Sequence, residues 1–263
     1  MKKIIITMLS LLTLVQIGFS LSTIDVAKKI KPATVTIIVF DKNQKELGHG
    51  SGYFYFDGQY PDAPAVAVTN FHVVSGKSNK SWHTFSYQVV LADGTKLPLA
   101  KFNYTDEEHD LALLIFDTIK AKDQASISPE PANTILVEGQ RVVVIGTPAD
   151  TQLSGTLSEG IISAIREKLG VIQFSAPVAF GSSGSALCDE NGQLIGTVQA
   201  IEDLSKAENI NFAIPAKWTA KLYADFIVAW KKYQKDPSVV KNPSKNTPQG
   251  DDENQENSSS LNN

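Results

Sequence analysis

Apolar residues in the middle of the chain come in short runs rather than at helical spacing. Between Val35 and Phe212 these runs are rich in Val, Ile, Phe and Tyr, a composition typical of strands. The clearest runs are 35–40, 53–56, 65–69, 88–91, 111–116, 141–145, 171–174 and 194–198, with turn signals at 92–94, 138–139 and 191–192. About a dozen short strands separated in this way indicate an all-β sandwich or pair of barrels. No long helical pattern interrupts them, which argues against alternating strands and helices.

Helical spacing is confined to the two flanks of this region. Apolar residues between Ile24 and Ile30 recur at helical spacing until Pro32, which predicts a short N-terminal helix. At the far end Pro215 can open a helix, and Lys231 and Lys232 suit its C-terminal end. The apolar face of this second helix comprises Trp218, Leu222, Phe226, Ile227 and Trp230. We interpret that face as one docked on the β structure rather than as a ligand site.

The first 22 residues have the pattern of a secretory signal. Lys2 and Lys3 precede an uncharged, mostly apolar run from Ile4 to Phe19, and small residues allow cleavage after Ser20 or Ser22. The alternative is an uncleaved anchor, but the run is shorter than the ~20 residues that usually span a bilayer. We therefore expect export, to a bacterial periplasm or to the medium, with no stable membrane span after cleavage.

The composition changes again after Tyr233. Residues 234–263 are mostly polar and include only three aliphatic side chains, Val239, Val240 and Leu261. Such a segment buries too little surface to offset its ordering entropy, and we expect a disordered tail. The remaining 23–233 form the predicted folded domain.

Charge and cysteine content exclude several classes of function. The net charge is −4, and it is two units more negative without the first 22 residues, whose only charges are Lys2 and Lys3. That balance excludes a dedicated nucleic-acid binder, which would carry a basic surplus. The single cysteine, Cys188, cannot form an internal disulfide and is expected to be a buried small residue. The spacing of His and Cys indicates no zinc site, so we expect no metal or other cofactor; the acidic run 106–108 is interpreted as a solvated turn, with calcium binding as the alternative.

A loop of small residues holds the first candidate for chemistry. Ser183 lies within residues 181–187, a Gly- and Ser-rich stretch between two predicted strands, where the chain can turn tightly. The backbone N–H groups of Gly181 and Ser183 can converge there on one point and stabilise a developing oxyanion. The alternative is an ordinary hairpin connection.

A serine nucleophile requires a base, and the base requires an acceptor. Of the four histidines, His72 stands out because it follows the predicted apolar strand 65–69 and precedes Val73 and Val74. Asp110 immediately precedes the strand 111–116, where its carboxylate needs a donor that His72 can supply. Each residue alone is also compatible with a structural or solvent-facing role, but together they follow the order His, Asp, Ser in an all-β chain.

Three ordered motifs resemble those of the trypsin-like serine peptidases, most closely the HtrA branch. They are Thr-Asn-Phe-His-Val-Val at 69–74, His-Asp-Leu-Ala-Leu-Leu at 109–114 and Gly-Ser-Ser-Gly-Ser at 181–185; further similar segments are 50–52, 191–196 and 210–215. The resemblance spans about residues 24–232. It implies two six-stranded antiparallel β-barrels with the active site between them. It also implies His72 as general base, Asp110 as its orienting acceptor, Ser183 as nucleophile, and the amides of Gly181 and Ser183 as the oxyanion hole.

The resemblance further implies a substrate pocket bordered by Val178, Ala179, Gln199, Ala200 and Ile201. Pro177 stands where Lys- or Arg-specific relatives have an aspartate, so we predict cleavage after a small or medium aliphatic residue. Four residues depart from the usual motif: Phe180, Ser182, Ser185 and Ala186. Ser182 replaces the usual Asn or Asp, so no buried ion pair with a new N-terminus can form there.

The leading hypothesis is an exported serine endopeptidase that forms an acyl-enzyme and acts on protein or peptide substrates in protein quality control. A non-catalytic protein-binding module with the same fold is the alternative, and hydrolysis of an ester or another acyl substrate is a third. HtrA relatives often form trimers, so a homo-oligomer is compatible with the resemblance, but no residue fixes the number of subunits.

Overall fold

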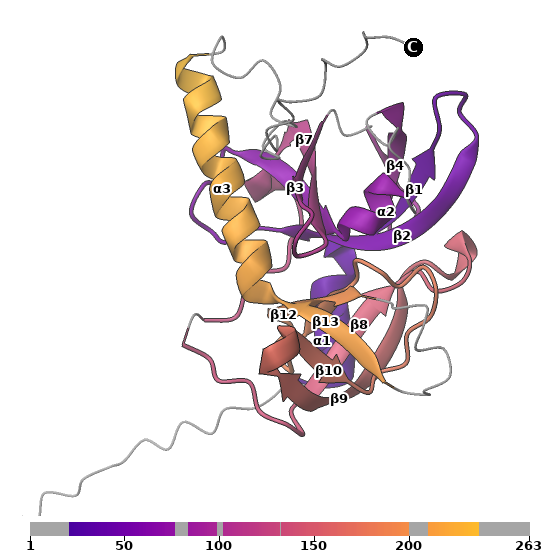
Figure 1. The fold of residues 1–263 in the computed structure, drawn as a ribbon, viewed down its shortest axis with the longest axis vertical. Coiled ribbons are helices and arrows are strands. Elements are labelled where there is room, and N and C mark those ends of the chain that lie inside the picture. Colours follow the sequence, from indigo (N-terminus) through magenta and orange to yellow (C-terminus); the bar gives the residue numbers. More distant parts are fainter. Residues whose placement is uncertain (1–20, 77–83, 99–101, 132, 200–209, 237–263) are drawn as a thin grey trace, which may run out of the picture.

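The structure is a computed structural model that describes residues 21–76, 84–98, 102–131, 133–199 and 210–236 (Figure 1). The expected signal segment, apart from its last two residues, and the expected tail beyond Asp236 lie outside these ranges. The predicted domain organisation therefore stays a prediction.

Thirteen strands and three α-helices make up the described part of the fold. The helices are α1 (Thr23–Ile30), α2 (Phe71–Ser75) and α3 (Ala216–Lys235). The strands of the first unit are β1 (Thr34–Phe40), β2 (Glu46–Tyr55), β3 (Pro64–Thr69), β4 (Ser86–Leu91), β5 (Lys96–Leu97), β6 (Phe102–Asp106) and β7 (Leu111–Lys120). Those of the second are β8 (Arg141–Gly146), β9 (Thr156–Arg166), β10 (Val171–Phe174), β11 (Ala186–Cys188), β12 (Leu194–Gln199) and β13 (Asn211–Pro215).

The strands form two antiparallel units, one above the other in Figure 1. The second unit is a closed barrel in the order β10-β13-β12-β11-β8-β9, which confirms the expected six strands. The first is a sheet in the order β5-β4-β1-β2-β3-β7-β6. It differs from the expected six-stranded barrel because the two-residue β5 adds a seventh strand beside β4 and no pairing between the edge strands closes the sheet among the described residues. The predicted all-β class is confirmed.

Alternation along the strands divides the apolar side chains between separate cores. On β7, Leu111, Leu113 and Ile115 belong to a central cluster, whereas the residues between them face the core of the first unit. The same alternation on β8 sends Val143 and Ile145 to the central cluster and Val142 and Val144 into the second barrel. Successive residues of a strand point to opposite faces of the sheet. A strand that is buried on both faces must therefore be apolar at every position.

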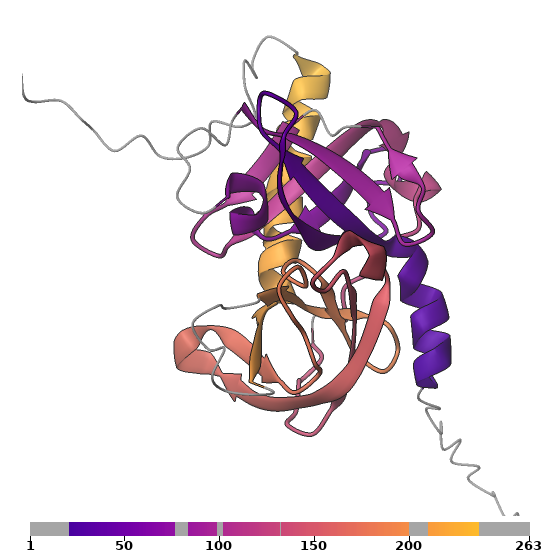
Figure 2. The same ribbon diagram turned by 90° about the vertical axis from the view of Figure 1, so that its right-hand side faces the viewer.

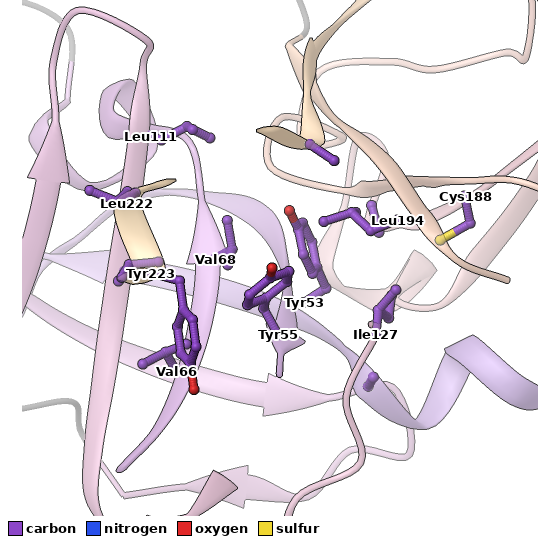
Figure 3. Packing of buried hydrophobic residues seen from close by; sticks show 14 of the residues in the cluster. Tyr53, Tyr55, Val66, Val68, Leu111, Ile127, Cys188, Leu194, Leu222 and Tyr223 are labelled. Atoms are coloured by element: carbon purple, nitrogen blue, oxygen red, sulfur yellow. The ribbon is translucent and has the colours of Figure 1, made fainter. Parts of the chain in front are cut away.

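The central cluster joins the two units. Tyr53 and Tyr55 of β2 lie between the α3 residues Leu222 and Tyr223 on one side and Leu194 of β12 on the other (Figure 3). Tyr53 is fully buried, and its hydroxyl lies 2.8 Å from the hydroxyl of Thr197, so the polar end of the ring is satisfied. The two units therefore share one core rather than meeting through a wet interface.

The flanking helices lie where the sequence predicts them. The Ser22 hydroxyl accepts a hydrogen bond from the Asp25 amide and caps α1, which runs along the outside of the second barrel (Figure 2). Helix α3 follows Pro215 directly and packs against β6 and β7 of the first unit and β12 of the second (Figure 1). Its apolar face is buried in the central cluster, which confirms the docking interpretation. In the described part of the chain, no helix combines the length and the apolar character needed to cross a membrane.

Candidate active site

His72 and Asp110 meet at the edge of the first unit. His72 lies on the five-residue helix α2, one turn after β3 ends, and not on the strand end itself. Its Nδ1 lies 2.8 Å from Oδ2 of Asp110, and its backbone N–H donates to Oδ1 of the same carboxylate over 2.9 Å. The structure thus brings together the predicted base and its predicted acceptor.

The carboxylate fixes the tautomer of the imidazole. An ionised carboxylate can only accept hydrogen bonds, so the proton between the two side chains belongs to Nδ1 of His72. The neutral ring then presents an unprotonated Nε2, which can take a proton from a nucleophile. The His72 side chain is 39% exposed and that of Asp110 is 19% exposed, so the ring is open to a substrate while its partner is sheltered.

Ser183 lies on a loop made of two consecutive turns. The Ser182 amide donates to the Ala179 carbonyl over 2.9 Å, and the Ser185 amide donates to the Ser182 carbonyl over 3.1 Å. Gly181 and Gly184 occupy the third position of each turn and both have a φ of 89°. A side chain is disfavoured at that φ, which explains a glycine at both positions.

The amides of this loop alternate in their hydrogen bonding. Those of Ser182, Gly184 and Ser185 donate to backbone carbonyls. Those of Gly181 and Ser183, both buried residues, have no acceptor among the described residues. Buried N–H groups without a partner are rare in folded proteins, so this pair is suited to an oxygen atom of a ligand.

Ser51 of β2 ties the loop to the first unit. Its Oγ donates to the Gly181 carbonyl over 2.7 Å and accepts from the Thr147 amide over 2.8 Å, while its N–H donates to the Ser183 carbonyl over 2.8 Å. The Ser51 carbonyl accepts in turn from the Thr69 hydroxyl over 2.7 Å. Ser51 is fully buried, and its role was not predicted, although it is the middle residue of the Gly-Ser-Gly segment at 50–52.

Gly50 shows how closely the His72 and Ser183 segments approach each other. A Cβ at this glycine would lie 2.7 Å from both methyl groups of Val73 and 3.3 Å from the Ser183 carbonyl oxygen. The residue after His72 and the backbone of Ser183 therefore flank one glycine. In the described part of the chain no hydrogen bond joins the imidazole to the Ser183 hydroxyl; such contacts often tighten only when substrate binds.

The predicted pocket residues fall into three groups. Val178 and Ala179 line a groove of about 440 Å³ together with Val144, Thr156 and Glu159. Gln199 instead directs its side-chain amide at Asp110, with Nε2 3.0 Å from Oδ2. Ala200 and Ile201 lie outside the described residues.

Local contacts accommodate three of the four residues that depart from the family motif. The Ser182 hydroxyl accepts from the Ala179 amide over 3.2 Å and so closes its own turn without an ion pair. Ser185 is fully buried, and a Cβ at Gly146 would lie 2.1 Å from its Oγ, so that glycine makes room for it. Phe180 is 61% exposed and packs edge-to-face with His49.

A second His–Asp pair anchors the turn that carries Asp110. The Nδ1 of His109 lies 2.8 Å from Oδ2 of Asp106, and the His109 ring stacks on Trp218 of α3 with centroids 3.6 Å apart. The acidic run 106–108 therefore includes one residue with a structural partner. Asp110 has a φ of 50°, so the turn ends in a conformation that few residues adopt.

Other candidate groups do not contribute chemistry. Cys188 of β11 is fully buried in the central cluster, and burial raises the pKa of its thiol, which disfavours the nucleophilic thiolate. Among the described residues, no group of three or more His, Cys, Asp or Glu side chains could hold a metal ion.

The sequence is similar to those of known peptidases. The family model described as a trypsin-like peptidase domain matches residues 50–196. A protein named "Serine protease Do-like HtrA" from Lactococcus lactis subsp. lactis is 33% identical over 184 residues, which cover 64% of this chain and 42% of that protein. A "Serine protease HtrA-like" protein from Staphylococcus aureus is 31% identical over 200 residues, 70% of this chain and 24% of that one. The chain thus spans less than half the length of these relatives.

Solved structures show the same likeness in three dimensions. A serine endoprotease from Yersinia pestis is 26% identical with a TM-score of 0.61, and the match covers 78% of this chain and 67% of that one. The HtrA-type protease AlgW, solved with a tripeptide, is 27% identical with a TM-score of 0.63 over 78% of this chain and 64% of that one.

Proposed function

The chain belongs to the trypsin-like peptidases, in their HtrA branch, and on that premise we propose that it is a serine endopeptidase that cleaves protein substrates through Ser183, His72 and Asp110. The contact of Nδ1 of His72 with Asp110 leaves Nε2 free to act as a base. The Gly50 contacts bring the His72 and Ser183 segments to one place. The proposal assigns a chemical role to each of these three side chains.

The reaction proceeds in two halves. Nε2 of His72 takes the proton of the Ser183 hydroxyl while Oγ bonds to the scissile carbonyl carbon, whose π electrons move to the oxygen. His72, now cationic beside Asp110, gives the proton to the leaving amine as the C–N bond breaks, and an acyl-enzyme remains. Water then attacks the ester by the same proton route and releases the carboxylic acid and free Ser183.

The pattern of amides in the loop 181–185 carries the proposal. Among the described residues, the loop amides without an acceptor are those of Gly181 and Ser183, the pair that the mechanism needs for the oxyanion. The amides between and after them are already engaged in the two turns. An ordinary hairpin connection has no reason to leave this alternate pair unbonded. The loop therefore favours a catalytic site over a protein-binding module.

Substrate preference and location extend the proposal. Val178 and Ala179 contribute apolar side chains to a groove that also includes Glu159. Pro177 stands where Lys- or Arg-specific relatives have an aspartate, which supports cleavage after small or medium aliphatic residues. Cleavage of a randomised peptide library tests this, and dominant cutting after Lys, Arg or Glu would contradict it.

The pattern of residues 1–22 supports export, and unfolded proteins are the proposed substrates. A mature N-terminus at residue 21 or 23, found by mass spectrometry of exported protein, tests the location.

The direct test uses a fluorophosphonate probe and unfolded casein. We expect the wild type to be labelled and to cleave casein, and Ser183→Ala to do neither. Ser185→Ala is the matched control, because it removes a buried hydroxyl two residues away and leaves the proposed nucleophile in place. A folded wild type that is not labelled and cleaves nothing would favour the protein-binding alternative.

A further inference from the structure

Helix α1, which stands beside the second barrel in Figure 2, borders a groove of about 790 Å³, called the α1 groove below. Its walls come from α1 and the two residues after it, from residues 91–93 at the end of β4, from residues 123–125 after β7, and from Leu157 of β9. A volume of this size is typical of ligand sites. The proposed catalytic residues and the loop 181–185 do not line the α1 groove, which is therefore a separate feature of the molecule.

Two faces of α1 have different surroundings. Val26 and Ile30 are buried in the central cluster. The groove takes another face, whose residues recur at helical spacing: Ile24, Ala27, Lys28 and Lys31. Ile24 is 68% exposed, and Leu157 on the facing strand is 39% exposed. The α1 groove therefore offers an aliphatic surface that is open to solvent.

Lys28 and Lys31 bring two cations to the α1 groove that have no ion-pair partner among the described residues. The lysine ion pairs of that part of the chain belong to Lys120, Lys122 and Lys221. Residues 28 and 31 are about one helical turn apart, so their side chains are neighbours. Lys31 also packs on the barrel, because a Cβ at Gly155 would lie 2.8 Å from its Cε. Two neighbouring ammonium groups favour an anionic ligand.

The other walls of the α1 groove carry carboxylates. Asp93 and Asp123 line it, and neither forms an ion pair with a described residue. The hydrogen bond from the Thr95 amide holds the pKa of Asp93 below its usual range, so this carboxylate is an acceptor at neutral pH. A fatty acid would place its carboxylate at the lysines but would bring no donor to the aspartates. A peptide chain brings backbone N–H donors as well as a terminal carboxylate.

We propose that the α1 groove binds the carboxyl-terminal end of a peptide with aliphatic side chains. The terminal carboxylate lies against Lys28 and Lys31, the backbone N–H groups face the aspartates, and the aliphatic side chains contact Ile24 and Leu157. Cleavage after an aliphatic residue leaves such an end on the amino-side fragment, so the identification of this ligand as a reaction product rests on the proposed function. Binding itself requires no cleavage.

The location of binding is tested on the full chain carrying Ser183→Ala, which cannot cleave the probe by the proposed mechanism. The probe is a tetrapeptide of valine and alanine, acetylated at its amino end, so that the terminal carboxylate is its only charge. It is titrated into isotope-labelled protein, and the backbone amide resonances are followed by NMR. We expect saturable shifts centred on residues 24–31, 91–93 and 123–125. Absence of saturable shifts there up to about 10 mM probe would overturn the proposal, whether or not the loop 181–185 responds.

The role of the charges is tested on the same protein. Amidation of the carboxyl end of the probe should weaken binding by about tenfold, since it removes a charged acceptor from both lysines. Lys31→Met leaves Lys28 in place and should weaken binding by about threefold. Lys29→Met is the matched control, because it removes the same charge from the same helix, while Nζ of Lys29 bonds to the Asn191 carbonyl and does not line the groove. Equal affinities for acid and amide, or equal losses in the two lysine variants, would overturn the proposal.

Octanoate tests whether the ligand must be a peptide. It has a carboxylate and an aliphatic chain but no N–H donor, and we expect it to bind at least about tenfold more weakly than the probe. Octanoate binding as tight as that of the probe would identify an aliphatic anion as the ligand and overturn the assignment to a peptide. All of these measurements use a protein without the proposed nucleophile. An inactive wild type would therefore contradict the proposed function without changing the result for the α1 groove.

Discussion

Replacement of Gly181 by alanine tests the proposed oxyanion hole most directly. A Cβ there would lie 2.4 Å from the Thr147 carbonyl oxygen and 2.7 Å from Nε2 of His49. Real Cβ atoms do not approach a backbone oxygen so closely, so the Gly181 backbone must move. The φ of 89° adds a conformational cost of about 1–2 kcal/mol for any side chain.

The displacement acts on the rate because the Gly181 amide is one of the two N–H groups of the loop 181–185 that have no acceptor among the described residues. Loss of a single oxyanion donor typically lowers kcat by about 10²- to 10³-fold. We therefore expect Gly181→Ala to lose at least about 100-fold in kcat on a peptide substrate, with a smaller change in KM, since the donor acts mainly in the transition state. Steady-state kinetics gives kcat and KM, and urea unfolding of the same preparation gives the loss of stability.

Gly139 provides the matched control. Its φ is 87°, almost that of Gly181, but a Cβ added there would meet no atom within 4 Å. Gly139→Ala should therefore lose a similar 1–2 kcal/mol, about the cost of the backbone conformation alone, and keep its kcat. A kcat for Gly181→Ala within about threefold of the wild type would refute the assignment of this amide to catalysis.

Three further substitutions have expected outcomes. Ser185→Ala removes a buried hydroxyl without a partner in the described structure and should raise the free energy of unfolding by about 1 kcal/mol, measured in urea; a loss of stability would contradict this. Burial, and then the negative charge of Asp189, raise the pKa of Glu130 to about 7. The folded state therefore holds a proton that the unfolded chain has already released, and stability falls as the pH rises from 4.5 to about 7. Between pH 5 and pH 8 the free energy of unfolding of the wild type should fall by about 1 kcal/mol, a value reduced for solvent screening. Glu130→Gln should not show this fall. Trp218→Ala removes the ring stacked on His109 and should lower kcat by about fivefold in a protein that still folds, because the turn before Asp110 loses its anchor; an unchanged kcat would exclude that coupling.

The strands were predictable because their apolar composition reflects their burial in the folded protein. The run 111–116 is apolar at every position, and the structure buries alternate residues of it in two different cores. β9 illustrates the limit of this reasoning, since Leu157, Ile161 and Ile165 are apolar but exposed. A sequence pattern gives the spacing of apolar residues, but which face of a strand meets another element depends on tertiary packing.

The parts of the site that lie within recognisable sequence motifs were predictable. His72 and Asp110 were paired from their positions next to predicted strands, and the structure joins them at 2.8 Å. The short helix that carries His72 has no periodicity to detect in five residues. Gln199 could not be linked to Asp110 from the sequence, because a contact between residues 89 positions apart depends on how the two units dock.

His72 and Asp110 belong to one unit, whereas Ser183 and Gln199 belong to the other. The catalytic rate would therefore depend on how the two units are aligned. A tilt of about one ångström between them would leave nearly all buried area in place yet misalign the reacting groups, which is enough to slow an enzyme severely. Turnover should therefore fade at urea concentrations where circular dichroism still reports intact strands. The protein would then lose its activity under mildly denaturing conditions well before it unfolds.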